Sequence, residues 1–75
     1  MKVKVRLFGI VAERAGKREM AIDVAEPVTV KKVMEATGLP LSKYVRAAVN
    51  EDYADAKTPV RPGDVVSLIP PVGGG

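Results

Sequence analysis

Apolar and basic residues alternate at the start of the chain. The alternation runs through Lys2, Val3, Lys4, Val5, Arg6 and Leu7. A period of two is typical of a β-strand that buries one face. We therefore predict a strand with its apolar face toward a core and its basic face outward. Phe8 follows on the outward parity, where it either folds over the edge of the core or belongs to an exposed contact patch.

Two short elements are predicted next. Residues 10–15 fit a short helical turn, and Gly16 follows as a cap in the left-handed conformation. Residues 20–24 alternate again between apolar and polar side chains, which indicates a second strand. Pro27 ends this strand, because proline cannot donate to a sheet hydrogen bond.

The main helix of the chain is predicted to begin at Thr29, a residue type favoured at helix N-termini. Helical spacing relates four residues that would form one buried stripe: Val30, Val33, Met34 and Thr37. Gly38 and Pro40 then end the helix. Residues 39–44 are ambiguous, and a helical turn beginning at Ser42 is one interpretation.

Three further strands are predicted in the second half. Residues 45–49 alternate, residues 50–52 form a turn, and residues 53–54 form a short return strand. After a tight turn at Pro62-Gly63-Asp64, the last strand runs from Val65 to Ile69. Both faces of this strand are partly apolar. One helix covers only one face of a sheet, so we favour an open second face that awaits a partner over a strand covered on both sides.

Together these elements predict an α+β domain over residues 1–71, with a mixed four- to five-stranded sheet and one main helix on one face. Residues 72–75 are predicted to form a flexible tail. The sequence has no run of apolar residues long enough to span a membrane and no signal-peptide pattern, so we expect a cytoplasmic protein that does not enter membranes.

Composition excludes several kinds of chemistry. The 75 residues include no cysteine and no histidine, so thiolate and imidazole ligands or nucleophiles are absent. Glu51, Asp52 and Asp55 are better explained as a solvated loop than as a metal site. The net charge of +3 and three aromatic residues do not form the dense basic and aromatic surface of a nucleic-acid binder. We therefore expect no metal and no direct nucleic-acid partner.

The C-terminus is the most unusual stretch, with the sequence Pro70-Pro71-Val72-Gly73-Gly74-Gly75. The two prolines stop the sheet and direct the residues after them away from the domain. Glycine has no side chain, so this end fits a narrow pocket of another protein, where it would bring the terminal carboxylate. The alternative is an unstructured end without a function.

The order of elements and the Gly-Gly end resemble the ubiquitin-like β-grasp fold. Three stretches resemble the small, sulfur-carrier subunit of molybdopterin synthase: 5–16, 47–50 and 62–75. The ending, in which a turn and a strand lead to Pro-Pro-Val and Gly-Gly, is the most specific of them. The family often has a small residue other than glycine at the third position from the end, where this chain has Gly73.

This resemblance implies a carrier without catalytic residues or a bound cofactor of its own. An adenylating enzyme of the E1 type would use ATP and magnesium to activate the terminal carboxylate. A persulfide donor would then convert it to a thiocarboxylate. The large synthase subunit, in a heterotetramer with the carrier, would pass the sulfur to cyclic pyranopterin monophosphate in molybdenum cofactor biosynthesis.

The residues expected to act in this way fall into three sets. Gly75 and Gly74 would form the sulfur-carrying terminus, and Gly73 and Val72 the tail that enters the partner. Five residues are predicted to bind the partner: Phe8, Val65, Ile69, Pro70 and Pro71. Arg6 or Lys4 would add charged contacts at the rim.

Other functions remain open at this stage. A related carrier would deliver sulfur to tRNA thiolation, thiazole synthesis or cysteine synthesis. A ubiquitin-like modifier would use the same activated glycine but join it to lysines of other proteins. A simple interaction module would have an inert tail, and truncating Gly74 and Gly75 would leave its binding intact.

Overall fold

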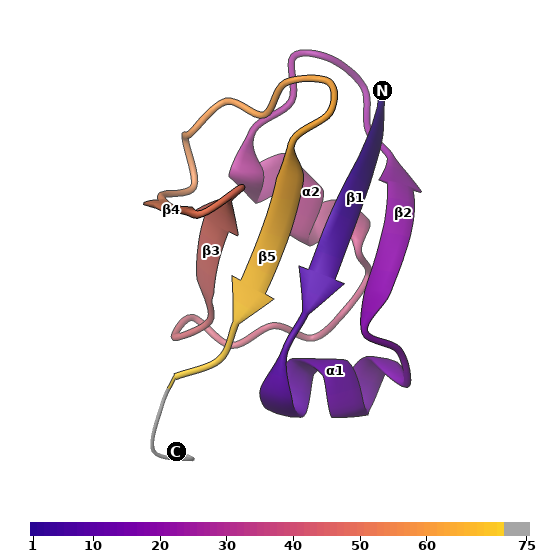
Figure 1. Cartoon of the computed structure of the whole chain (residues 1–75), viewed down its shortest axis with the longest axis vertical. Helices are drawn as coiled ribbons and strands as arrows, with labels where there is room; N and C mark the ends of the chain where they lie inside the picture. Colours follow the sequence, from indigo (N-terminus) through magenta and orange to yellow (C-terminus); the bar gives the residue numbers. More distant parts are fainter. Residues whose placement is uncertain (72–75) are drawn as a thin grey trace.

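The computed structural model describes residues 1–71, which fold into five strands and two helices (Figure 1). Along the chain these elements are β1 (Lys2–Leu7), α1 (Gly9–Ala15), β2 (Glu19–Asp23), α2 (Val30–Ala36), β3 (Arg46–Val49), β4 (Asp52–Ala54) and β5 (Val65–Ile69). Of these residues, none belongs to a helix with the length and apolarity needed to cross a bilayer.

The five strands form one mixed sheet in the order β2-β1-β5-β3-β4. The last strand, β5, lies at the centre, parallel to β1 and antiparallel to β3. The remaining neighbours, β1 with β2 and β3 with β4, pair antiparallel. The central place of β5 means that the chain leaves the sheet from its middle and not from an edge.

Helix α2 crosses one face of the sheet, and α1 lies beyond the end of β1 (Figure 1). The alternation predicted for β1 is confirmed, because its three apolar residues are buried and its three basic residues are exposed. Twelve buried residues make up the core: Val3, Val5, Leu7, Val11, Val24, Val28, Val30, Val33, Ala47, Val60, Val66 and Leu68. Nine of the twelve are valines, and they come from the strands, from both helices and from the loops.

The ends of both helices are set by the residues that the sequence pattern indicates. Gly16 ends α1 with a φ of 74°, and its N–H donates to the carbonyl oxygens of Ala12 and Glu13. The Oγ1 of Thr29 accepts from the backbone N–H of Lys32 at 3.4 Å and caps the start of α2. Gly38, with a φ of 70°, follows the end of α2.

No helix forms over residues 39–44, but a single hydrogen-bonded turn does begin at Ser42, whose carbonyl oxygen accepts from the N–H of Val45 at 3.2 Å. The Oγ of Ser42 accepts from the N–H of Tyr44 at 3.1 Å, which closes a local turn instead of starting a helix. Leu39 and Leu41 pack against the core from this loop. Both leucines are half-buried, so the loop lies against the core on its way to β3.

Candidate functional site

The candidate site begins with the sheet face that α2 does not cover. The strand register places Val65 beside Lys4, and Ser67 between Arg6 and Ala48. Because side chains alternate along a strand, these residues all point away from Val66 and Leu68, which are fully buried on the helix side. The predicted open second face of β5 is therefore present.

Two small side chains, Ala48 and Ser67, lie side by side at the centre of this open face, and we call this strip between longer side chains the trough. Ala48 and Ser67 are only 6% and 8% exposed, although no helix lies over them. The residues that pair with them on the neighbouring strands have long side chains: Arg6 lies beside Ser67, and Tyr53 lies beside Ala48. The flanking side chains thus shield the floor, and a partner that displaces them would reach the centre of the sheet.

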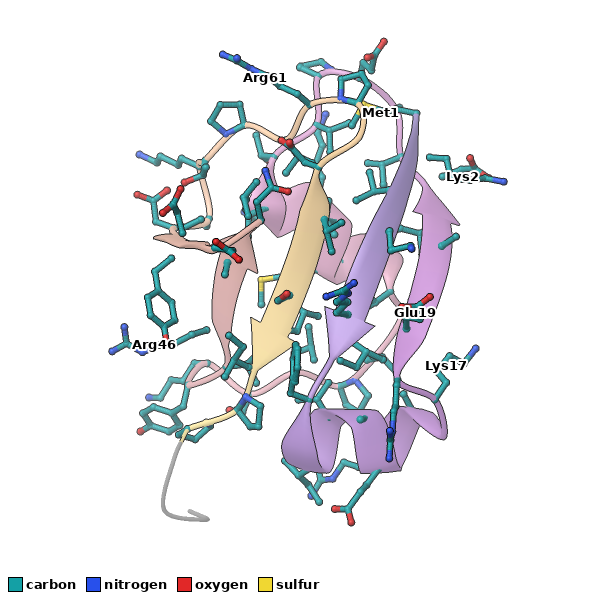
Figure 2. All side chains as sticks on the ribbon, in the orientation of Figure 1. Met1, Lys2, Lys17, Glu19, Arg46 and Arg61 are labelled. Carbon is teal, nitrogen blue, oxygen red and sulfur yellow. The ribbon has the colours of Figure 1, made fainter. Side chains whose placement is uncertain are left out.

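Cationic side chains flank the trough on both sides. Arg46 lies on the β3 side, with its guanidinium 5.9 Å from the ring centre of Tyr53 (Figure 2). On the β1 side, Lys4 forms an exposed ion pair of 3.9 Å with Glu19. Exposed pairs of this kind add little stability, so these charges are available to a partner. The face therefore presents cations on both sides, together with the carboxylates of Glu51 and Asp52, which line the same surface beside Val65 and Ser67.

The end of β5 adjoins a groove of about 400 Å³. Pro70 and Pro71 line one part of it, and the helix α1 and the loop 39–45 line the rest. The full set of lining residues is Ile10, Val11, Arg14, Leu39, Pro40, Leu41, Ser42, Tyr44, Val45, Pro70 and Pro71. The last residues before the C-terminal segment thus run along an apolar, accessible surface.

Four of the five predicted partner-binding residues, Phe8, Ile69, Pro70 and Pro71, lie at this end of the molecule, whereas Val65 lies at the other end of β5. Phe8 is 44% exposed and follows β1, which runs parallel to β5, so it leaves the sheet at the same end as Pro70. Phe8 is therefore exposed, as a contact patch requires, and its contact with a partner stays a prediction. Val65 and Ile69 are half-buried on the open face. Their role in binding stays a prediction.

The residues predicted to carry sulfur and to form the tail are Val72, Gly73, Gly74 and Gly75, and they lie outside the described residues. The structure instead describes what precedes them: a central strand, a half-buried Pro70 and an exposed Pro71. The described chain therefore ends at Pro71, beside the groove.

Several exposed side chains near this end were not predicted from the sequence. Ile10 and Tyr44 are 48% and 64% exposed and line the groove, and Tyr53 and Arg46 flank the trough. The parity of Tyr53 in its short strand was the available signal. No local pattern indicates a role for Ile10 and Tyr44, because they reach the groove only through the packing of α1 and the loop 39–45 beside the prolines.

Carboxylates do not form a metal site in the described part of the chain. Within residues 1–71, no group of three or more His, Cys, Asp or Glu side chains is arranged to hold an ion. Asp55 has a structural role, because its Oδ1 accepts from the N–H of Lys57 at 2.9 Å and from the hydroxyl of Thr58 at 3.2 Å. Asp55 thus stabilises its own loop through these two bonds.

Comparisons with solved structures give the same fold for several small proteins. SAMP1 from Haloferax volcanii superposes with a TM-score of 0.85 at 26% identity over 100% of both chains. A protein described as molybdopterin converting factor subunit 1 from Pyrococcus furiosus gives 0.82 at 28% identity, covering 96% of this chain and 99% of that one. These matches confirm the predicted ubiquitin-like β-grasp fold.

A third similar chain comes from the complex of subunits 1 and 2 of molybdopterin-converting factor from Helicobacter pylori 26695. It is 33% identical over 100% of both chains, with a TM-score of 0.68. A search of the curated proteins found no match. The ThiS family matches residues 5–75 of the sequence, which is nearly the whole chain. The chain therefore belongs to the ThiS family of ubiquitin-like sulfur carriers.

Proposed function

We propose that this protein carries sulfur as a thiocarboxylate on Gly75 for molybdenum cofactor biosynthesis. The observation that supports this most is the end of β5, where a central strand stops at Pro70 and Pro71 between an open sheet face and an apolar groove. A partner that docks there has the Gly-Gly end of the sequence immediately beyond its contact surface.

The chemistry requires activation, because a carboxylate is a poor electrophile. An E1-like enzyme would use ATP and magnesium to form an acyl adenylate on Gly75 and release pyrophosphate. A persulfide sulfur would attack the acyl carbon and displace AMP. A second thiol would cleave the resulting S–S bond and leave the thiocarboxylate. The carrier supplies the acyl group and the docking surface, and the enzyme supplies the catalytic groups.

The proposed acceptor is cyclic pyranopterin monophosphate in the active site of a large molybdopterin synthase subunit. The Helicobacter pylori relative is described in a complex of subunits 1 and 2, which supports a protein partner of this kind. For this chain we propose a heterotetramer with the large subunit, in which Phe8, Val65 and Ile69 make apolar contacts. The cytoplasm is the proposed compartment, where ATP and the activating enzyme would be available.

Deletion of Gly75 tests this proposal. The shortened chain should lose ATP–pyrophosphate exchange with the activating enzyme, because the reacting carboxylate would be displaced by one residue. Its melting temperature should match that of the full-length chain, since the described core ends at Leu68. A substitution at the distant turn, Lys57→Ala, serves as the control and should leave exchange unchanged. Equal exchange in the shortened and full-length chains would contradict the proposal.

A second candidate function is protein modification. It is favoured by the similarity to SAMP1, which is described as a small archaeal modifier protein. In this case the adenylated glycine would pass to a lysine amine instead of to sulfur. Mass spectrometry that finds Gly-Gly remnants on lysines of other proteins, dependent on Gly75, would support modification. Sulfur delivery to tRNA thiolation or thiazole synthesis would be recognised by supplying each acceptor in turn.

A further inference from the structure

The start of α1 lies unusually close to the end of β5. Gly9 has a φ of 53°, in the left-handed region that disfavours side chains. A Cβ atom on Gly9 would lie 2.8 Å from Cγ and 3.7 Å from Cδ of Pro70. The ring of Pro70 is closed onto its own backbone and cannot rotate aside. A side chain at position 9 would therefore force the backbone of Pro70 or of α1 to move.

The other glycines of the described chain lack this contact. Gly16, Gly38 and Gly63 also have positive φ angles, of 74°, 70° and 89°. A Cβ atom on any of these three would meet nothing within 4 Å. The positive φ angle alone therefore explains glycine at these three positions. At position 9 a side chain would also collide with Pro70.

The parallel pairing of β1 with β5 explains why the two residues meet. Leu7 is paired with Leu68, so the chain leaves both strands at the same end of the sheet. From there Gly9 starts α1, and Pro70 starts the path to the C-terminus (Figure 1). The ring of Pro70 therefore packs against the first turn of α1.

We propose that Gly9 is a positioning residue for the C-terminal segment. Its missing side chain lets Pro70 pack against α1, and this packing fixes the direction in which Pro70 and Pro71 leave the sheet, along the groove that Ile10 also lines. The inference rests on the proposed function in one respect: the direction matters because it presents Gly75 to the activating enzyme.

The direct test compares Gly9→Ala with Gly16→Ala, which lies at the other end of the same helix. Both variants introduce a methyl group at a positive φ, but only the first meets Pro70. The natural chain has no cysteine, so Val72→Cys provides a unique attachment site for a nitroxide label. The label broadens backbone amide signals of nearby residues in NMR spectra, which reports the direction of the segment.

The set of broadened amides should change in Gly9→Ala and remain as in the parent chain in Gly16→Ala. Pro70→Ala removes the ring without straining position 9, so it should also change the set of broadened amides. If Gly9→Ala does not fold, the result for Pro70→Ala alone tests the proposal. Unchanged broadening in the folded Gly9→Ala and Pro70→Ala chains would overturn the proposal. Because this readout needs no enzyme, it remains valid even if the proposed sulfur transfer is wrong.

Activation kinetics supply the functional readout. If Gly9 positions the segment, Gly9→Ala should lower kcat of the activating enzyme by about tenfold, since small misplacements of a reacting group are costly. Its KM should change less than kcat, because Val65, Ile69 and the rest of the open face are unaltered. The Gly16→Ala control should retain both constants. An equal loss in the two variants would show a general effect of backbone strain and would contradict a positioning role. No activation of the unaltered chain would count against the proposed function, not against the Gly9–Pro70 contact.

Discussion

Asn50 is bonded through its side chain and its backbone to Val65, the first residue of the central strand. The Oδ1 of Asn50 accepts from the N–H of Val65 at 3.1 Å, and the N–H of Asn50 donates to the carbonyl oxygen of Val65 at 2.7 Å. Its Nδ2 also donates to Oδ1 of Asp64 at 3.1 Å. With a φ of 58°, Asn50 is the one non-glycine residue in the described chain with a positive φ. It therefore ties the turn between β3 and β4 to the start of β5.

The first prediction concerns this connection. Asn50→Ala should lower the free energy of unfolding by about 1–3 kcal/mol, because it removes the side-chain hydrogen bonds and places a Cβ-bearing residue without them at a positive φ. Asn50→Gly is the matched control, since it loses the hydrogen bonds but relieves the backbone. It should be destabilised less than Asn50→Ala in denaturant unfolding. Equal stability of Asn50→Ala and the parent chain would show that the connection contributes nothing.

The second prediction concerns Asp64 and pH. The N–H of Arg61 donates to Oδ2 of Asp64 at 2.9 Å, and this bond, together with the one from Asn50, holds the pKa of Asp64 below its ordinary value of 3.8. A carboxyl with a lowered pKa in the folded state stabilises the fold above the unfolded pKa and loses this contribution as pH falls through the folded pKa.

Asp64→Asn should therefore melt below the parent chain at neutral pH, and the difference should shrink once the pH falls below 3.8. Thermal unfolding followed by circular dichroism between neutral and acidic pH measures the difference directly. If the difference in melting temperature stays constant over this range, the charge of Asp64 does not contribute to stability, and only uncharged contacts of the side chain do.

The third prediction separates the two faces of β5. Leu68 is fully buried against the core, whereas its neighbour Ile69 is half-buried on the open face. Leu68→Ala should lower the free energy of unfolding by about 2–5 kcal/mol. Ile69→Asp should lower it far less but weaken binding of the large subunit in titration calorimetry. If Ile69→Asp unfolds the domain, Ile69 belongs to the core and the assignment of the binding face is wrong.

The fourth prediction concerns the cations beside the trough. Arg6→Glu should slow association with the partner and make the rate less sensitive to added salt, because Arg6 borders Ser67 at the floor of the open face. Lys31→Glu makes a comparable change of charge on α2, which covers the other face of the sheet. Stopped-flow association should be slowed more by the first variant than by the second. An equal effect would indicate attraction by net charge only.

The sequence predicted much of the fold because most of its signals are local. Alternation identified β1 and β2, and Thr29 and Gly16 identified helix ends. The two apolar faces of β5 also carried information, since a central strand with an open face follows from having one main helix to cover the sheet. Residues 39–44 were predicted only in part, because the half-buried Leu39 and Leu41 contact the core from a loop and show no helical spacing.

The candidate site was less predictable, because it depends on contacts between distant segments. Phe8 and Val65 were identified from their parity, which is a local property. The contact of Gly9 with Pro70 joins residues from opposite ends of the chain, and no local pattern indicates it. The same holds for Tyr44, which reaches the groove only because its loop passes beside the prolines.

The central claim is that Gly75 carries sulfur, and intact mass spectrometry tests it most directly. The protein would be incubated with an activating enzyme, ATP, magnesium and a persulfide donor, and then fragmented to locate any change. We predict a mass gain equal to the replacement of one oxygen by one sulfur, located at Gly75 and absent without ATP. An unchanged mass with an enzyme that activates a related carrier, or an adenylate that ends only on lysines, would contradict the claim.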